Sequence, residues 1–308
     1  ILFWVYHNFD FTKVGEVLLH GTNWWWMFFS LLFGVLAQVF RGWRWKQMLE
    51  PLEAFPKRSD CVNAIFISYA ASLIVPRVGE VSRCGVLAKY DNVSFAKSLG
   101  TVVTERLVDT LTILLITGVT VLLQLPIFVT FLQQTGTKIP SLLHLVTSVC
   151  FYIVLFCFIG VGMLLYYLRK TLFFYERVKG FVLNIWEGVM SLKGVRNIPL
   201  FSFYTLAIWG CYFFHFYFTF YCFAFTAHLS ILAALVMFVG GTFAVIVPTP
   251  NGAGPWHFAV ISMMMLYGVN ETDAGIFALI VHGIQTFLVV LLGVYGLAAL
   301  SLTNKQRK

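Results

Sequence analysis

The sequence predicts an all-α polytopic membrane protein, with about six spanning helices and two re-entrant hairpins broken by Pro and Gly. Hydrophobic residues make up 59% of the 308 residues and charged residues only 11%, whereas a soluble domain carries roughly 25% charged residues. Several apolar stretches exceed the ~18 residues that indicate a membrane-spanning helix. The ~10-residue alternating segments of a transmembrane barrel do not occur. We therefore expect 1–308 to form a single transmembrane domain.

The basic residues gather in three regions of the chain, 41–58, 169–196 and 305–308. The loops between them hold few basic residues, such as Lys13 and Lys138. Because cytoplasmic loops carry an excess of Lys and Arg, we expect these three regions, and with them the C-terminus, on the cytoplasmic side. The net charge of +8 therefore indicates orientation and attraction to anionic lipids, and no nucleic-acid partner is expected.

Long apolar stretches give the predicted spans. They are the tail of a helix at 1–6, followed by 24–40, 96–123, 142–168, 200–223 and 274–300. Trp24, Trp25 and Trp26 fit an aromatic belt at the outer end of their helix. The chain begins at Ile1 without Met, so we expect the natural N-terminus to lie upstream.

Residues 171–192 differ from the spans, because polar residues interrupt an apolar series at helical spacing. The apolar series is Phe174, Val178, Phe181, Ile185 and Val189. This pattern predicts an amphipathic helix that lies on the cytoplasmic surface of the membrane. The alternative is a plain polar connector.

Two apolar stretches are too short or too broken to cross the membrane simply. In 61–90 an apolar run of about 15 residues stops at Pro76 and a second short run follows, which favours a re-entrant hairpin over two spans. In 231–267 the apolar run stops at a Pro- and Gly-rich segment, 248–255, and a short apolar run again follows.

These two hairpins resemble each other. Residues 73–76 read LIVP and residues 245–248 read VIVP, and each is followed by a break, a short return, a polar turn and a long span. The predicted topology brings the first hairpin in from the inside and the second from the outside, so the two units form an inverted repeat. Such paired, interrupted segments indicate the binding site of a transporter. The alternative is that Pro76 and Pro248 only kink ordinary helices.

Broken helices in a membrane are tolerated only against protein or a water-filled cavity. Their free N–H groups and positive dipole ends suit a phosphate or carboxylate group. The candidate substrate-binding residues of the second break are Asn251, Gly252, Gly254, Trp256 and His257. The glycines allow close approach of a ligand to the backbone, as Gly79 does in the first break, and His257 could gate or donate to a phosphate.

Charged residues cluster around the first break. The candidate substrate-binding residues there are Arg77, Gly79, Glu80, Arg83, Glu105, Arg106 and Asp109. A charged residue at the centre of a spanning helix costs roughly 2.5–3.5 kcal/mol, so these side chains need a protein-lined interior. Arg106 and Asp109 are spaced i,i+3 and can pair on one helix face, while Glu105 would face Arg77 or Arg83.

We hypothesise that the arginines of this cluster form a cationic pocket for an anionic headgroup and that the acidic residues orient them. The alternative is a structural network of ion pairs near the inner interface, with snorkelling side chains. The seven His show no spacing typical of metal ligands, and the six Cys form no CxxC, so no metal site and no cofactor are expected. No catalytic motif is present either, so we do not expect an enzyme.

The segments Pro76-Arg77-Val78-Gly79-Glu80 with Arg83, Glu105-Arg106 with Asp109, and 248–254 resemble the flippase-like family, also called the lysylphosphatidylglycerol synthase transmembrane domain family. The resemblance covers nearly the whole chain. It implies an integral protein of the bacterial inner membrane that moves a lipid headgroup between leaflets. Bifunctional relatives carry a cytosolic aminoacyltransferase domain; none is found in this sequence, so synthase activity is not expected. Ser72 stands where Asn is expected and His257 where many members carry Glu, and these departures concern the substrate rather than the fold.

Three functions are compatible with these residues. The first is a translocase for an anionic or phosphate-bearing lipid headgroup, whose partners are membrane lipids. The second is a proton-coupled secondary transporter of a small soluble anion, with Glu105, Asp109 or His257 carrying protons. The third is a membrane enzyme that uses Glu105 or His257 as acid or base on a lipid. A lateral opening toward lipid favours the first function, a closed aqueous vestibule the second, and product formation the third.

Overall fold

A computed structural model describes residues 11–127 and 175–305, together with single positions at 2, 6, 9, 129, 152, 156 and 163. The described residues are helical almost throughout and contain no strand beyond one isolated bridge between Thr22 and Phe223, which confirms the all-α class. The chain divides into two compact units, residues 1–124 with 185–308, and residues 125–184. The contacts given below lie within the first unit, and a single transmembrane domain over 1–308 stays a prediction.

Four described helical segments are long and apolar enough to cross a membrane, at Trp24–Leu52, Phe95–Leu123, Ile198–Cys222 and Glu271–Thr303. They correspond to four of the predicted spans. The predicted span at 142–168 and most of the helix tail at 1–6 lie outside the described residues. Short helical segments complete the fold: α2 (Thr12–Glu16), the π-helical turn η1 (Val17–Gly21), and the 3-10 turns η2 (Glu50–Leu52), η3 (Ser191–Gly194) and η4 (Phe218–Cys222).

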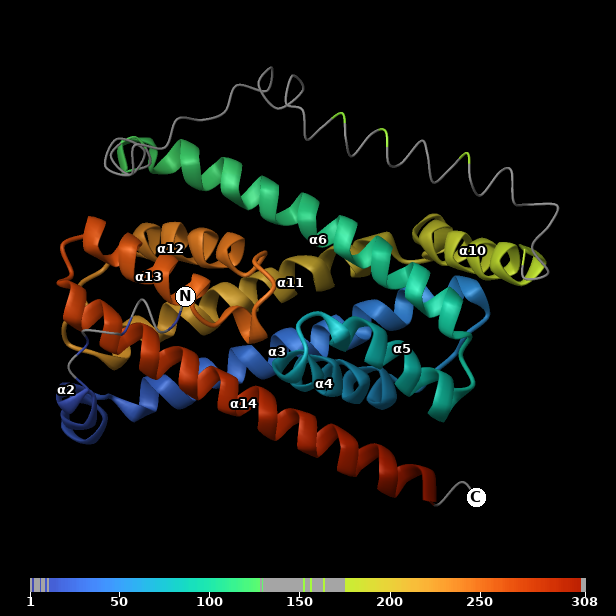
Figure 1. The fold of residues 1–308 in the computed structure, drawn as a ribbon, viewed down its shortest axis with the longest axis horizontal. Coiled ribbons are helices and arrows are strands. Elements are labelled where there is room, and N and C mark those ends of the chain that lie inside the picture. The colour runs from blue at the N-terminus through green and yellow to red at the C-terminus, as the bar shows by residue number, and fades with distance from the viewer. Residues whose placement is uncertain are drawn as a thin grey trace. The chain divides into compact units, whose positions relative to one another are not determined.

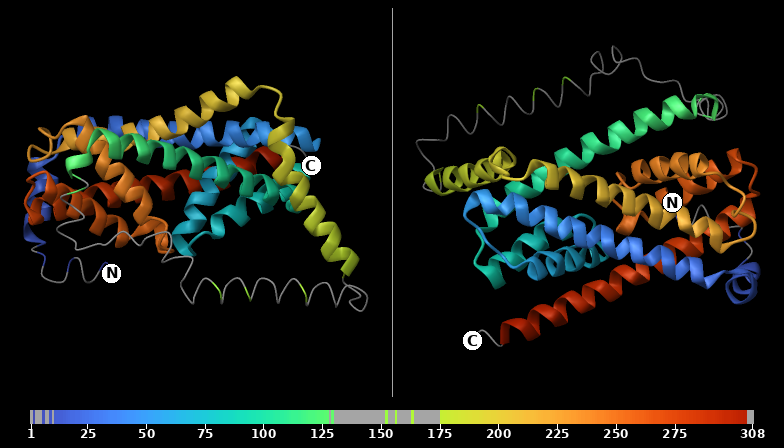
Figure 2. Two further views of the ribbon diagram at one scale, coloured as in Figure 1. Left: turned by 90° about the horizontal axis from the view of Figure 1, so that it is seen from above. Right: turned by 180° about the vertical axis from the view of Figure 1, so that it is seen from behind.

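Helices α3 (Trp24–Leu49) and α11 (Ile198–Tyr217) pack along each other, as Figure 2 shows from behind, with α3 in blue and α11 in yellow. Asn23 and Asn197 cap their first turns, each accepting a hydrogen bond from a backbone N–H. Phe218 places its ring 5.0 Å from that of Phe29. The prediction ended the first helix at residue 40, but α3 continues to Leu49, because the arginines that follow are buried and paired.

The first broken pair consists of α4 (Arg58–Ile74) and α5 (Val78–Asp91), which pack against each other. Arg77 in the break has a left-handed backbone, with φ at 65°. Gly79 permits the close packing of the pair, because a Cβ at this position would overlap the Ser68 carbonyl oxygen and the Ser72 hydroxyl. After a short linker α6 (Phe95–Leu123) begins, capped by the side chain of Ser94.

The second broken pair consists of α12 (Ile231–Ala244) and α13 (Pro255–Leu266), with the 3-10 turn η5 (Pro250–Gly252) inside the break. Left-handed backbone again marks the break, at Asn251, Gly252 and Gly254. The long helix α14 (Glu271–Lys305) follows. The element order that the sequence predicts, a short helix, a break, a short helix and a long helix, therefore occurs in both halves.

The two halves interlock (Figure 1). The long helix α14 of the second half packs on α4 of the first, and α6 of the first half packs on α12 of the second. Close approach of α14 to α4 depends on Gly293 and Gly296, where a Cβ would meet Ala70 and the Asn63 carbonyl oxygen. Each broken pair is thus held by the other half's long helix, and the two breaks are brought to the same region.

A helix is present where an amphipathic one is predicted. It is α10 (Tyr175–Met190), followed by the turn η3. Its last residues contact α6, where Gly188 lies against Gly100 so closely that a Cβ on either would overlap the other helix's backbone. Its place on the cytoplasmic surface of the membrane stays a prediction.

Candidate functional site

The two helix breaks border one cavity of about 510 Å³. Helices α3 and α6 complete its wall. The residues lining it include Arg41, Ser72, Pro76, Arg77, Glu80, Arg83, Arg106, Thr110, Thr242, Thr249, Asn251 and Gly252. The side chain of Arg77 joins the two breaks, because its Nη2 donates a hydrogen bond to the carbonyl oxygen of Ile246 at 2.9 Å.

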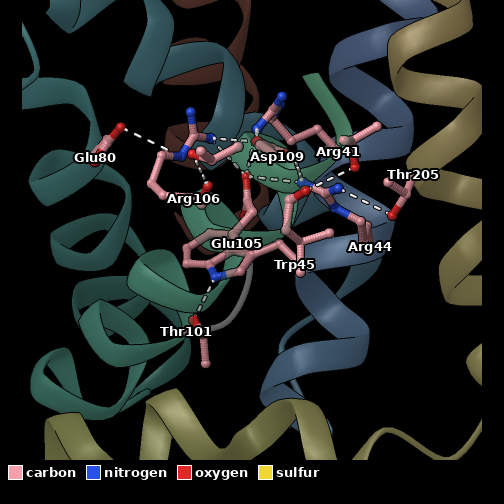
Figure 3. Close-up of polar contacts among 12 residues, drawn as sticks. Arg41, Arg44, Trp45, Glu80, Thr101, Glu105, Arg106, Asp109 and Thr205 are labelled. Atoms are coloured by element: carbon pink, nitrogen blue, oxygen red, sulfur yellow. Dashed lines mark hydrogen bonds and ion pairs between the residues drawn. The ribbon is translucent and has the colours of Figure 1, made fainter. Parts of the chain in front are cut away.

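Glu105 on α6 lies at the centre of a buried ion-pair network beside this cavity (Figure 3). Its carboxylate is fully buried and accepts from Arg41 at 2.6 Å, and from Arg83 and Arg106 at 3.0 Å each. The arginines come from α3, α5 and α6, so one carboxylate ties together three helices. Of the two predicted partners for Glu105, the structure gives Arg83 and not Arg77.

Asp109, one helical turn further along α6, is the second centre of the network. It lies 2.7 Å from Arg41 and 2.7 Å from Arg44, both on α3. Arg106 approaches it at 3.3 Å, as the i,i+3 spacing predicted. Arg44 also donates to the Thr205 hydroxyl of α11 at 3.2 Å, which adds a fourth helix to the assembly. Figure 3 shows Arg41 and Arg44 on one side of the two carboxylates and Arg106 on the other.

Arg41 and Arg44 are functional-site candidates that the sequence reasoning missed. They were expected to mark the inner, cytoplasmic end of the helix at 24–40, because they follow its apolar stretch. In the structure both are inside the protein, 3% and 0% exposed. The sequence does contain a signal for this role. Arg41 and Arg44 are spaced i,i+3, which places two cations on one face of a helix, and the buried carboxylates Glu105 and Asp109 on another span require cationic partners.

Arg83 faces the cavity with unused hydrogen-bonding capacity. Its side chain lies over the ring of Trp45, 4.6 Å from the ring centroid, and its Nη1 bonds Glu105. Its Nε and Nη2 are buried and have no hydrogen-bond partner among the described residues. A buried guanidinium N–H group without a hydrogen-bond partner is unfavourable. These N–H groups are therefore suited to donate hydrogen bonds to an acceptor on a ligand.

The network carries more positive than negative charge. Four arginines, Arg41, Arg44, Arg83 and Arg106, meet the carboxylates of Glu105, Asp109 and Glu80. Glu80 is the weakest partner, 3.6 Å from Arg106 and partly exposed. Arg77 adds another cation at the cavity wall. The cavity is therefore an electropositive site in apolar surroundings, which favours an anion.

The predicted residues of the second break divide into two groups. Asn251 and Gly252 line the cavity, and the Asn251 side chain donates to Thr286 of α14 at 2.7 Å. His257 is instead buried behind the break, where its Nδ1 accepts from the Gly254 N–H at 3.3 Å and caps α13.

His257 also packs on His282, with 4.6 Å between the ring centroids, and the ring of Trp256 lies 5.2 Å from that of His282, tilted by 37°. Neither His257 nor Trp256 is among the residues that line the cavity, and neither is Gly254. Their predicted part in substrate binding stays a prediction. In the described part of the chain, no three His, Cys, Asp or Glu side chains are grouped so that they could hold a metal ion.

A search of curated proteins and a search of solved structures gave no match. The model of one protein family, described as Lysylphosphatidylglycerol synthase TM region, matches residues 1–293. The match spans both broken helix pairs and the ion-pair network that joins α3, α5 and α6. With nearly its whole length matched, the chain belongs to the lysylphosphatidylglycerol synthase TM region family, as its residues around the two breaks predicted.

Proposed function

We propose that this membrane protein moves an anionic or phosphate-bearing lipid headgroup between the leaflets of the bilayer. The observation that carries the proposal is the arginine-lined cavity between two broken helix pairs. An anionic headgroup that crosses the apolar interior needs a polar, positively charged path, and this cavity offers one. Such movement needs no covalent chemistry, so the protein acts as a transporter and not as an enzyme.

The two broken pairs act as re-entrant hairpins in this proposal. Helices α4 and α5 have 17 and 14 residues, and α12 and α13 have 14 and 12. At 1.5 Å per residue they reach roughly 18–26 Å, less than the ~30 Å of the hydrocarbon core. The breaks then lie within the membrane. The two hairpins enter it from opposite sides and form an inverted repeat, so the cavity between their breaks lies near the midplane.

Apolar side chains at the breaks favour a lipid over a soluble anion. Ile74 is 83% exposed and Ile246 is 60% exposed, and each belongs to a different break. Val75, Val245 and Val247 beside them are also exposed. Exposed aliphatic side chains next to a charged cavity suit a molecule with an apolar tail and a charged head. In this proposal the cavity opens laterally toward lipid tails.

The family membership and the charge distribution support a bacterial inner-membrane location with the C-terminus in the cytoplasm. Lys305 ends α14, and the basic regions 41–58 and 169–196 are then on the same side. Membrane lipids are the proposed partners.

Reconstitution into proteoliposomes tests the proposal. Fluorescent lipids with anionic, zwitterionic and cationic headgroups are followed by quenching of the outer leaflet, with wild type, Arg106→Ala and, as a matched control, the exposed Arg196→Ala. We expect wild type and the control to accelerate anionic lipids and Arg106→Ala to lose the acceleration. Full activity of Arg106→Ala would contradict the proposed role of the cavity. Uptake of a small soluble anion without any lipid movement, dependent on pH, would favour the proton-coupled transporter instead.

A further inference from the structure

The cavity has a second wall whose chemistry differs from that of the arginines. Its polar side chains are uncharged: Ser72, Thr110, Thr242, Thr249 and Asn251. They come from α4, α6 and α12 and from the second break, so the uncharged polar residues of this neutral wall and the arginines line the same cavity. A ligand that fills the cavity touches both walls.

Two of the three threonines of the neutral wall, Thr110 and Thr242, have already used their hydroxyl hydrogens. Thr110 donates to the carbonyl oxygen of Arg106 and Thr242 to that of Phe238, each at 2.7 Å. What these hydroxyls offer to a ligand is therefore an acceptor lone pair. The hydroxyl of Thr249 is buried and has no partner among the described residues, so it can both donate and accept. Hydrogen-bond donors on the ligand match this wall.

Two kinds of donor group occur on phospholipid headgroups, hydroxyls and ammonium groups. Among the described residues that line the cavity, Glu80 is the one acidic side chain, and it already pairs with Arg106. Glu105 and Asp109 lie behind the wall and are shared among arginines. An ammonium group would therefore be repelled by the surplus positive charge and would find no free carboxylate to pair with. A hydroxyl group is uncharged and is not repelled.

We infer that the cavity selects a phosphate ester whose other substituent is uncharged and rich in hydroxyls, such as a glycerol, inositol or sugar phosphate, and disfavours headgroups that carry an amine. The phosphate meets Arg83, Arg106 and Arg77, where Arg83 has two unpaired donors, and the hydroxyls meet the threonines. The inference rests on the proposed function and names the substrate class of the same site.

The test compares four fluorescent lipids in proteoliposomes of the full chain: phosphatidate, phosphatidylglycerol, phosphatidylinositol and phosphatidylethanolamine. We expect phosphatidylglycerol and phosphatidylinositol to move about tenfold faster than phosphatidylethanolamine. Repulsion between the ammonium group and one arginine several ångströms away is enough to slow movement by at least that factor. Equal acceleration of phosphatidylethanolamine would overturn the inference and leave the translocase proposal standing. No acceleration of any lipid would overturn the translocase proposal itself.

A second arm separates the neutral wall from the phosphate site. Thr110→Val removes an acceptor from the cavity, and Thr112→Val is the matched control, because Thr112 makes the same bond to its own helix, to Val108, and does not line the cavity. We expect Thr110→Val to slow phosphatidylglycerol roughly two- to tenfold relative to phosphatidate, which has no hydroxyl substituent, and the control to leave the ratio unchanged. An unchanged ratio in Thr110→Val would overturn the inference.

A third arm identifies the source of the phosphate ester. Uptake of soluble glycerol 3-phosphate is measured in the same vesicles, since a free ester could fill the same cavity. We expect no uptake above empty vesicles, because the exposed aliphatic side chains at the breaks hold a lipid tail. Uptake of the soluble ester without lipid movement would overturn the lipid assignment.

Discussion

Neutralising Glu105 is the sharpest test of the buried network. The carboxylate is fully buried and receives three hydrogen bonds of 2.6–3.0 Å from Arg41, Arg83 and Arg106. The substitution Glu105→Gln keeps the side-chain volume but removes the charge. Four arginines then face the two carboxylates of Asp109 and Glu80 instead of three, so the surplus positive charge of the network rises from one to two.

The expected loss of stability is large because the unpaired cations are buried. Removing one partner of a buried ion pair destabilises a protein by about 3–5 kcal/mol. If each kcal/mol lowers Tm by roughly 2–4 °C, the range for domains of about 150–250 residues, Glu105→Gln lowers Tm on the order of 10 °C. The measurement is thermal unfolding of the detergent-solubilised protein, followed by size-exclusion chromatography after heating.

The matched control is Glu187→Gln. Glu187 also forms an ion pair, 2.7 Å from Lys97, but its side chain is 54% exposed. Exposed pairs contribute about 0–1 kcal/mol, so we expect a shift of only a few °C at most. If Glu105→Gln and Glu187→Gln lower Tm equally, the reasoning about buried charge is refuted.

A double substitution tests the charge balance itself. Arg41→Gln in the background of Glu105→Gln removes the cation that bonded the lost carboxylate most closely. We expect the double variant to be more stable than the sum of the two single variants predicts, because residues in one network couple. Strict additivity of the two losses would count against a shared network.

Two glycine substitutions test the helix packing, each against a glycine of the same helix that has open space around it. Gly100→Ala in α6 places a Cβ against the backbone of α10 and should destabilise the folded protein by about 1–3 kcal/mol. Gly118→Ala in the same helix should be neutral or slightly stabilising. Thermal unfolding compares the two variants. Gly79→Ala in α5 places a Cβ against α4 and should lower both Tm and lipid movement, while Gly85→Ala should preserve both. Equal behaviour within either pair would contradict the close packing seen in the structure.

Local signals allowed much of the fold to be predicted. Apolar length alone predicts α6, α11 and α14, and the Pro residues at 76 and 248 mark both breaks. The pair between Arg106 and Asp109 also follows from sequence, because an i,i+3 spacing on a helix fixes the distance between two side chains.

The partners of Glu105 could not all be predicted, because they are distant in the chain. Arg41 lies 64 positions before Glu105, and nothing in its neighbourhood distinguishes it from a loop arginine at a membrane surface. Only the packing of α3 beside α6 turns this basic residue into a buried partner. The sequence places His257 after a Gly-rich break, and the structure adds that its Nδ1 accepts from the Gly254 N–H and that it is not among the residues lining the cavity.

The sequence by itself determined that this is a helical membrane protein with a broken helix pair and a long helix in each half, because hydropathy, helix breaks and i,i+3 pairs are signals local to one stretch of chain. The tertiary structure decided which charges meet. It brings arginines from α3 and α5 onto the two carboxylates of α6, and it places both breaks around one cavity. The physical reason is that the energy of a buried charge depends on every neighbour within a few ångströms, and those neighbours come from helices far apart in the sequence.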